Sequence, residues 1–257
     1  LDPLSYVFGL IFSLAAFLSL LYAWHVRDTI QQVATLLYAG AGIGAVFAAD
    51  LVTLFVFWEG TAIASVFLIW AQRTEGAYAT GMRYLIIQVG SGVILLAGII
   101  LYYRETGTIA FSQMELGSPA TWAIFLAFGI KCAFPLLHNW LQDAYPAATI
   151  TGTVTLSAFT TKLAVYALAR GFPGTELLLY IGVTMTLFPV FFAAIENNLR
   201  RVLAYSLNNQ LGFMVVGVGI GTPLALNGTV AHAFCHILYK ALLFMSVGAV
   251  MYRTGTS

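Results

Sequence analysis

The amino-acid sequence predicts an all-α membrane protein that crosses the bilayer many times. Of its 257 residues, 60% are hydrophobic and only 8% are charged, whereas an ordinary soluble domain carries roughly 25% charged residues. A single core of this length could not hide so much apolar surface from water. Apolar runs of membrane-spanning length, about 20 residues, also recur along the chain. We therefore expect a polytopic membrane protein with one transmembrane domain, residues 1–257.

Nine apolar runs are expected to form about nine spanning helices, joined by short loops. In order, they cover residues 5–24, 33–49, 51–71, 83–103, 121–145, 150–169, 177–195, 202–222 and 229–252. The first run lacks the basic leader and small-residue cleavage site of a signal peptide, so we expect it to be retained as a span. The fifth run contains Pro135. Because proline removes a backbone donor and clashes with the preceding turn, we expect this one helix to be broken.

The second run contains Gly40, Gly42 and Gly44, a spacing that superficially resembles a dinucleotide-binding loop. The spacing is GxGxG rather than GxGxxG, and no strand precedes it, so close helix packing is the better interpretation. The sequence contains no Walker A motif, and its net charge of +1 offers no basic face to nucleic acid. We therefore expect neither a nucleotide nor a nucleic acid as a partner.

Arginines in the loops divide unevenly between the two sides of the predicted membrane. Threading nine spans places Arg27, Arg73, Arg83, Arg200, Arg201 and Arg253 on one side. Only Arg104 and Arg170 fall on the other side. The positive-inside rule assigns the arginine-rich side to the cytoplasm, which leaves the N-terminal end outside. We expect a multi-pass protein of the cell (inner) membrane, embedded in its lipid bilayer.

All three lysines and one glutamate lie deep inside apolar runs. At 1.5 Å per residue, Lys131 lies ~15 Å into its run, and Lys162 and Lys240 lie ~18 Å into theirs. Glu59 lies ~13 Å beyond Asp50, which is expected to cap its helix. An ionisable group at this depth costs at least ~2.5–3.5 kcal/mol and marks an ion pathway by default.

The choice of lysine over arginine in the interior favours proton transfer. Arginine stays protonated in proteins, whereas a buried lysine can release its proton. A structural ion pair between Glu59 and one lysine is the alternative interpretation. It does not account for four ionisable groups on four helices with positive charge in excess, so we favour a proton relay.

Two histidines extend this pattern. His232, His236 and Lys240 are spaced four residues apart and lie on one face of the last predicted helix. Histidine titrates near neutral pH and can pass protons in either direction. Zinc binding by the HxxxH pair is the alternative, but the glutamate of an HExxH site is absent and we expect no metal. Cys132 and Cys235 lack CxxC spacing, so we also expect no iron–sulfur cluster or other cofactor.

The eighth run opens with two arginines and a polar stretch, 205–210. We expect Ser206, Asn208 and Asn209 to form a mouth that admits water from the cytoplasm. Hydrogen bonds between helices would explain these residues equally well. A polar stretch also follows Pro135, and freed carbonyls at membrane depth are tolerated where they line a hydrated cavity. A broken helix beside a buried lysine is a recurring feature of transporters.

Five segments carry a resemblance to a known family. They are AADLVTLFVFWE ending at Glu59, FGIKCAFP with WLQDAYPA, TTKLAVYALAR, LRRVLAYSLNNQLGFM and HAFCHILYKALLF. With these segments the chain resembles the proton-translocating membrane subunits shared by respiratory complex I and Mrp-type cation/proton antiporters, and the D-type antiporter subunit most. Because the chain starts at Leu1 without a methionine, we expect it to be a portion of a longer subunit, the third to eleventh of fourteen helices.

The resemblance implies a fold and a role for each charged residue. It implies an antiporter-like fold of two inverted five-helix repeats, with 33–170 as the first repeat and 176–257 as part of the second. Glu59 and Lys131 would form a coupling ion pair, and Lys162 would be the central proton carrier. Lys240, His232 and His236 would link the carrier toward the exit. Gln142, Asn198 and His138 depart from the usual family pattern, which leaves the detail of the cytoplasmic mouth open.

The function implied is a proton-translocating subunit of a multisubunit Na⁺/H⁺ antiporter, with other membrane subunits as partners. One alternative is a proton-pumping subunit of an NADH:quinone oxidoreductase or a membrane-bound hydrogenase, whose complex would count as an enzyme. A second is a non-conducting assembly subunit whose charges only hold helices together. The residues do not decide the cation, the partner subunits or the driving reaction.

Overall fold

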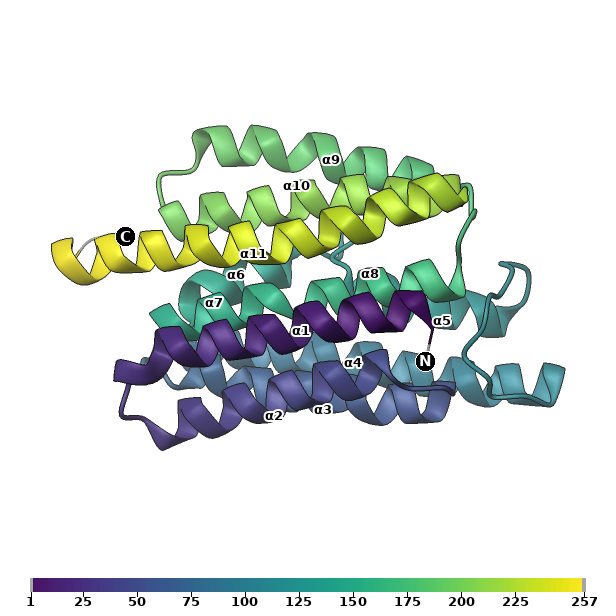
Figure 1. The fold of residues 1–257 in the computed structure, drawn as a ribbon, viewed down its shortest axis with the longest axis horizontal. Coiled ribbons are helices and arrows are strands. Elements are labelled where there is room, and N and C mark those ends of the chain that lie inside the picture. The colour runs from purple at the N-terminus through teal and green to yellow at the C-terminus, as the bar shows by residue number, and fades with distance from the viewer. Residues whose placement is uncertain (1, 256–257) are drawn as a thin grey trace.

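The computed structural model describes residues 2–255, and these residues confirm the all-α class. Every regular element within this range is a helix, apart from an isolated β-bridge between Asp50 and Ala110. The helices run roughly along the long axis of the molecule, with the two chain ends at opposite ends of the bundle (Figure 1). An odd number of crossings requires this placement of the ends.

Eleven α-helices and one 3-10 turn make up the described part of the chain. They are α1 (Pro3–Tyr22), η1 (Ala23–His25), α2 (Thr29–Val46), α3 (Leu51–Trp70), α4 (Glu75–Thr106), α5 (Pro119–Lys131), α6 (Asn139–Ala147), α7 (Ile150–Ala158), α8 (Thr160–Gly171), α9 (Leu177–Ile195), α10 (Leu199–Ile220) and α11 (Pro223–Thr254). In Figure 1, α9 to α11 lie along one side of the bundle and α2 to α4 along the other. Helices α1, α7 and α8 lie between these two groups.

The helices begin and end where local chemistry requires. Asp2, Asp28 and Asp50 cap α1, α2 and α3 by accepting hydrogen bonds from first-turn amides. The cap expected at Asp50 is therefore confirmed, with Oδ1 accepting from the Thr53 amide at 2.8 Å. Gly107, which ends α4, has a φ of 72°, a left-handed conformation that glycine adopts without strain.

Five helical segments are long and apolar enough to cross a membrane: α1 with η1, α3, α4, α9 and α11. The other predicted spans correspond to α2, to α10, and to the pairs α5–α6 and α7–α8. The count of nine crossings stays a prediction. Large apolar side chains such as Leu36, Val56 and Ile86 are exposed on the outer faces of their helices, as lipid or neighbouring apolar helices require.

The fifth predicted span is interrupted between α5 and α6. Helix α5 stops at Lys131 and α6 starts at Asn139, so Pro135 lies inside the interruption. Ala133 and Leu136 have positive φ angles of 61° and 69°, which turn the chain out of the helical path. The Trp140 indole N–H donates to the carbonyl of Ile130 at 3.0 Å and so satisfies one of the freed backbone groups.

The sixth predicted span is also interrupted, although its sequence predicts no break. Residues 150–169 were expected to form one continuous helix, but the structure divides them into α7 and α8 at Phe159. Neither proline nor glycine marks this position. Side chains replace the missing helical bonds: the Thr160 amide donates to the Tyr38 hydroxyl at 2.9 Å, and the Tyr145 hydroxyl donates to the Leu156 carbonyl at 2.8 Å. Residues distant in sequence therefore stabilise the break.

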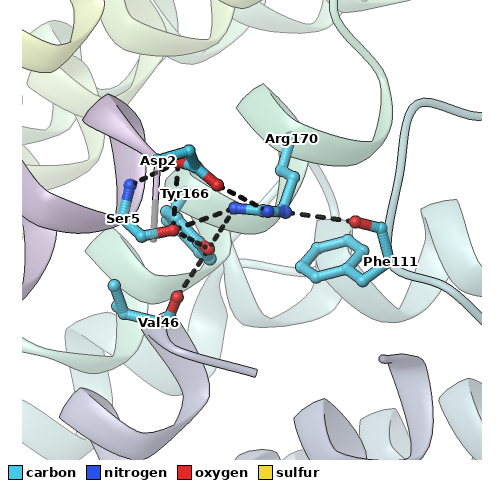
Figure 2. Close-up of polar contacts among 6 residues, drawn as sticks. All are labelled: Asp2, Ser5, Val46, Phe111, Tyr166 and Arg170. Carbon is cyan, nitrogen blue, oxygen red and sulfur yellow. Dashed lines mark hydrogen bonds and ion pairs between the residues drawn. The ribbon is translucent and has the colours of Figure 1, made fainter. Parts of the chain in front are cut away.

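Arg170, near the end of α8, joins several segments at the N-terminal end of the bundle (Figure 2). Its Nη2 pairs with Asp2 at 2.7 Å, and its Nη1 donates to the hydroxyls of Ser5 and Tyr166 at 3.0 and 2.8 Å. Its Nε donates to the carbonyl of Phe111 in the loop between α4 and α5, at 3.1 Å. We call this set the Arg170 clamp; it fixes α8 to α1 and to that loop.

Replacing Arg170 with lysine should lower the thermal stability of the protein. Lysine keeps the charge but loses the planar fork of donors, and each charged hydrogen bond lost is worth about 1.5–3 kcal/mol. The midpoint of thermal unfolding in detergent measures the effect. Arg104→Lys is the control, since Arg104 lies at the same end, is exposed, and its side chain forms no hydrogen bond or ion pair among residues 2–255. Equal midpoints for the two variants would contradict the prediction.

The clamp should also weaken in acid. Burial of the Asp2 carboxyl would raise its pKa, but hydrogen bonds from the Ser5 amide and the Arg170 side chain outweigh burial and hold the pKa below its ordinary value. The ionised pair therefore stabilises the fold above the ordinary pKa of a carboxylate, and this gain is lost as the pH falls through the lowered pKa. Asp2→Asn should show a smaller loss of thermal midpoint on acidification than the unaltered protein.

Candidate functional site

The three lysines predicted to lie at membrane depth are all in the interior. Lys131 and Lys162 are fully buried, and Lys240 is 1% exposed. They come from α5, α8 and α11, whereas Glu59 comes from α3. Because a buried charge is tolerated only with partners, the contacts of each side chain show what the site can do.

Lys131 is held by the backbone and a hydroxyl of α3. Its Nζ donates to the Trp58 carbonyl and to the Thr61 Oγ1, both at 2.8 Å. The same nitrogen lies 4.4 Å from the centre of the Trp58 ring, close enough for a cation–π contact. As the last residue of α5, Lys131 stands at the edge of the first interruption, where its position depends on how that interruption is folded.

The ion pair implied between Glu59 and Lys131 is not formed among the described residues. Oε1 of Glu59 is buried and has no hydrogen-bond partner. The carboxyl group lies against Gly92 of α4, so closely that an added Cβ there would overlap Oε1. The cause is helical geometry: Trp58 and Thr61, three residues apart, share the face of α3 that meets Lys131, whereas the side chain of Glu59 leaves the helix in another direction.

Lys162 closes the second interruption. Its Nζ donates to the carbonyl of Ser157 at 2.6 Å, one of the groups freed by the break at Phe159. The neighbouring Thr161 hydroxyl is buried without a hydrogen-bond partner. The amine thus has one protein acceptor among residues 2–255, and two further positions from which a proton can be passed.

A network of hydroxyl groups connects the helices around these two lysines. The Ser65 hydroxyl of α3 bonds the Tyr84 hydroxyl of α4 at 2.8 Å, the Tyr84 hydroxyl lies near the Thr160 side chain, and Thr160 bonds Tyr38 of α2. Ser65 lies one helical turn after Thr61. The network therefore starts next to the Lys131 contacts and ends two residues before Lys162 in the chain.

This hydroxyl network was not predicted from the sequence. Its signal there is faint, because Ser and Thr are ordinary residues in spanning helices and Tyr38 and Tyr84 lie in separate runs. The four-residue spacing of Thr61 and Ser65 places both hydroxyls on one face of α3. That spacing was the only local indication of a polar face beside the lysines.

The residues predicted on α10 and α11 form a second polar cluster. Nζ of Lys240 donates to the Ser206 hydroxyl at 2.9 Å, and Nε2 of His232 lies 3.0 Å from Oε1 of Gln210. His236 is fully buried, and neither of its ring nitrogens has a hydrogen-bond partner in the described structure. The centres of the His232 and His236 rings are 6.1 Å apart.

The three residues expected at the cytoplasmic mouth have different surroundings. Ser206 lies beside Lys240, as just described. Asn208 is fully buried and its amide atoms have no hydrogen-bond partner. Asn209 donates to the Thr186 carbonyl of α9, which is the helix–helix bond of the alternative interpretation. In the described part of the chain, no group of three His, Cys, Asp or Glu residues is placed to hold a metal ion.

Several buried polar groups have no partner within residues 2–255. The side chains concerned in the interior include Glu59, Gln88, Gln142, Thr161, Asn208 and His236. Buried polar atoms in native proteins are normally satisfied by protein or by ordered water. These groups are spread over α3, α4, α6, α8, α10 and α11.

Comparison with known proteins places this chain in a family. Residues 48–257 match the family model described as NADH:quinone oxidoreductase/Mrp antiporter, TM. The chain is 33% identical over 240 residues to the D-type subunit of the Na(+)/H(+) antiporter of Alkalihalophilus pseudofirmus, covering 84% of this chain and 48% of that protein. It is 27% identical over 287 residues to the M-type subunit of the NADH-quinone oxidoreductase of Pseudomonas aeruginosa, covering 100% of this chain and 56% of that protein.

Two solved structures have the same fold. A chain of the Mrp complex from Dietzia sp. DQ12-45-1b matches with a TM-score of 0.92 and 26% identity, covering 100% of this chain and 52% of that chain. A chain of the membrane-bound sulfane sulfur reductase, an archaeal respiratory membrane complex, matches with a TM-score of 0.89 and 26% identity, covering 98% and 56%. The chain thus spans about half the length of these relatives.

The resemblance found in the sequence is confirmed by the match over residues 48–257 and by the shared fold. The apolar helices and this membership together make the chain part of a multi-pass membrane protein. It belongs to the family of transmembrane subunits shared by NADH:quinone oxidoreductases and Mrp antiporters.

Proposed function

We propose that the chain is the proton-translocating portion of a subunit of a multisubunit Na⁺/H⁺ antiporter. The main support is the row of buried lysines on α5, α8 and α11, with a hydroxyl network between Lys131 and Lys162. The similarity to the D-type antiporter subunit of Alkalihalophilus pseudofirmus favours Na⁺ as the exchanged cation. Other membrane subunits would be its partners, in the inner membrane of the cell.

The proposed path runs through the residues that the sequence singled out. Glu59 and Lys131 act as the coupling pair, Lys162 as the central carrier, and Lys240 with His232 and His236 as the link toward the exit. Ser206, Asn208 and Asn209 would line the cytoplasmic entrance. We also propose residues 33–170 as the first five-helix repeat and 176–257 as part of the second.

The coupling step that we propose is the making and breaking of the Glu59–Lys131 contact. Lys131 is held by Trp58 and Thr61, so a swing of the Glu59 carboxyl away from Gly92 would bring the two charges together. A change in neighbouring charge alters the proton affinity of a buried lysine. Moving one charge through ~100 mV involves about 2.3 kcal/mol, a scale that one buried ion pair can match.

A redox-driven proton pump is the second candidate function. Similarity to the M-type subunit of the Pseudomonas aeruginosa NADH-quinone oxidoreductase covers the whole chain, and the fold matches a subunit of a respiratory reductase. The proton path within the chain would be the same in both cases, and only the partner that drives it would differ.

The pH change evoked by cations in everted vesicles distinguishes the two candidates. The vesicles would carry the full subunit in its complex, with no respiratory donor added. A signal evoked by Na⁺ and lost in Lys162→Ala supports the antiporter. Proton uptake that needs NADH or another donor, with no response to Na⁺, supports the redox-driven pump.

Removing the Tyr38 hydroxyl should slow transport. Tyr38→Phe keeps the ring but removes the group that bonds Thr160 and its amide, so we expect roughly tenfold slower transport, equivalent to about 1.4 kcal/mol in the barrier. Tyr180→Phe is the control, because its hydroxyl donates to the Glu176 carboxylate at the exposed start of α9, away from the lysines. Equal transport rates per assembled complex in the two variants would exclude the hydroxyl network from the path.

A further inference from the structure

A cavity of about 600 Å³ opens at the end of the bundle where α1 and α11 finish. Helices α1, α7 and α11 contact one another, and α1 and α11 finish at the same end of the bundle (Figure 1). Most of the lining surface is apolar, and the polar side chains on it are Tyr22, His25, Gln31, Gln72, Thr149, Thr151, Arg200 and Tyr252. None of the groups proposed for proton transfer lines this cavity.

The surroundings of the cavity place it at the level of lipid headgroups. Trp24 and Tyr252 are 84% and 80% exposed, and aromatic residues of this kind gather at membrane–water interfaces. Arg27 and Arg253 flank it in the chain, on the side that the arginine distribution assigns to the cytoplasm. The cavity therefore faces the cytoplasmic leaflet, whose surface carries anionic lipids.

Arg200 gives the cavity a positive charge. Its Nη1 donates to the Ala148 carbonyl at 2.7 Å and lies 3.4 Å from the Thr153 hydroxyl. Its Nε is buried without a partner, and Arg200 forms no ion pair with any carboxylate among residues 2–255. Arg201, next in the chain, is paired with Asp143 and Glu196 instead.

No carboxylate among the described residues lines the cavity to balance this charge. The nearest acidic residue in the adjoining loop, Asp28, is engaged by Gln31 at 3.1 Å and by Arg73 at 3.2 Å. The hydrogen bond from Gln31, together with the positive charge of Arg73, keeps the pKa of Asp28 below its ordinary value. The Asp28 carboxylate is therefore paired with these two residues and not with Arg200. Arg200 therefore has an unmatched guanidinium at the wall of an otherwise apolar space.

We propose that this cavity binds the phosphate of an anionic phospholipid from the cytoplasmic leaflet. A guanidinium donates to phosphate oxygens in a planar, charge-assisted arrangement. His25 and Tyr252 add donors at the rim, and the apolar wall formed by Ile150 and Met251 accommodates the start of the acyl chains. Basic pockets between spanning helices on the cytoplasmic side are known to hold such headgroups. The proposal concerns binding and does not depend on the transported ion.

Photo-crosslinking tests the site directly. The full subunit in its complex is reconstituted into phosphatidylcholine vesicles that contain a small fraction of phosphatidylglycerol with a photoactivatable headgroup. Cross-links to the last turns of α11 and the first turn of α7 are then measured by mass spectrometry. We expect Arg200→Gln to reduce these cross-links roughly tenfold. Ala249→Trp, which fills the cavity from an exposed position and leaves the Arg200 side chain in the protein, should have the same effect.

Two matched variants serve as controls. Arg201→Gln removes the neighbouring charge, and Val250→Trp adds the same ring to an exposed position outside the cavity; neither should change the cross-links. Unlabelled phosphatidylglycerol should compete, whereas phosphatidylcholine and inorganic phosphate should not. Equal cross-linking in all four variants, or equal competition by phosphatidylcholine, would overturn the proposal. Competition by phosphate alone would instead make this a site for the free anion and would overturn the lipid assignment.

Discussion

Replacing Lys162 with alanine should abolish proton transport while leaving the amount of assembled complex unchanged. Lys162 is fully buried at the α7–α8 break, and no other lysine, histidine, aspartate or glutamate of α7 or α8 could take over its proton. We expect transport to fall at least roughly a hundredfold, or about 2.7 kcal/mol in the barrier. The rate of cation-evoked pH change per complex in everted vesicles measures the effect.

Lys162→Arg distinguishes a role of Lys162 in proton transfer from a purely structural role of its charge. Arginine keeps the positive charge and can still donate to the Ser157 carbonyl, but it does not release its proton. We expect this variant to assemble normally and to be as inactive as Lys162→Ala. An assembly role predicts the reverse pattern, in which Lys162→Ala lowers the abundance of the complex and Lys162→Arg restores both abundance and flux.

Glu59→Gln should also slow coupled transport at least roughly a hundredfold. The substitution keeps the size of the side chain and removes the charge that the proposed pair needs. Since Oε1 of Glu59 has no hydrogen-bond partner, the neutral amide should cost the fold little. Glu75→Gln, at the exposed start of α4, is the control for loss of a carboxylate. Full activity of the Glu59 variant, measured in the same vesicles, would remove the carboxylate from the mechanism.

A glycine pair on α4 tests the position of the Glu59 carboxyl as well as its charge. A Cβ at Gly92 would overlap Oε1 of Glu59, so Gly92→Ala must push the carboxyl group out of its place. Gly90 has nothing within 4 Å of an added Cβ, which makes Gly90→Ala a control two residues away on the same helix. Transport should fall strongly in the first variant only. Similar rates in both would mean that the carboxyl works equally well from another position.

The helix positions and the deep lysines could be predicted from the sequence because they rest on local properties. Run length and hydropathy locate a spanning helix, Asp50 has the chemistry of a cap, and Pro135 favours an interruption because proline removes a backbone donor. Lys131 and Lys162 stand out because each is the single lysine or arginine in its apolar run.

The break at Phe159 and the open Glu59–Lys131 contact could not be predicted in this way. The break is stabilised by Tyr38 and Tyr145, which belong to other helices and reach it only in the folded bundle. The contact depends on the rotation of α3, which sends Trp58 toward Lys131 and Glu59 toward α4. Such rotations are set by packing between helices, and a single sequence does not show them.

The Arg170 clamp has a mechanical consequence for Lys162. Helix α8 contains 12 residues, so it is a short rigid helix about 18 Å long. Arg170 anchors its outer end to α1 and to the loop that holds Phe111, while the break at Phe159 separates its inner end from the helical path of α7. Any rotation of α8 about its anchored end displaces the inner end farthest, and Lys162 is the third residue from that inner end. We expect that a displacement too small to disturb the outer surface would carry the amine from one proton partner to the next.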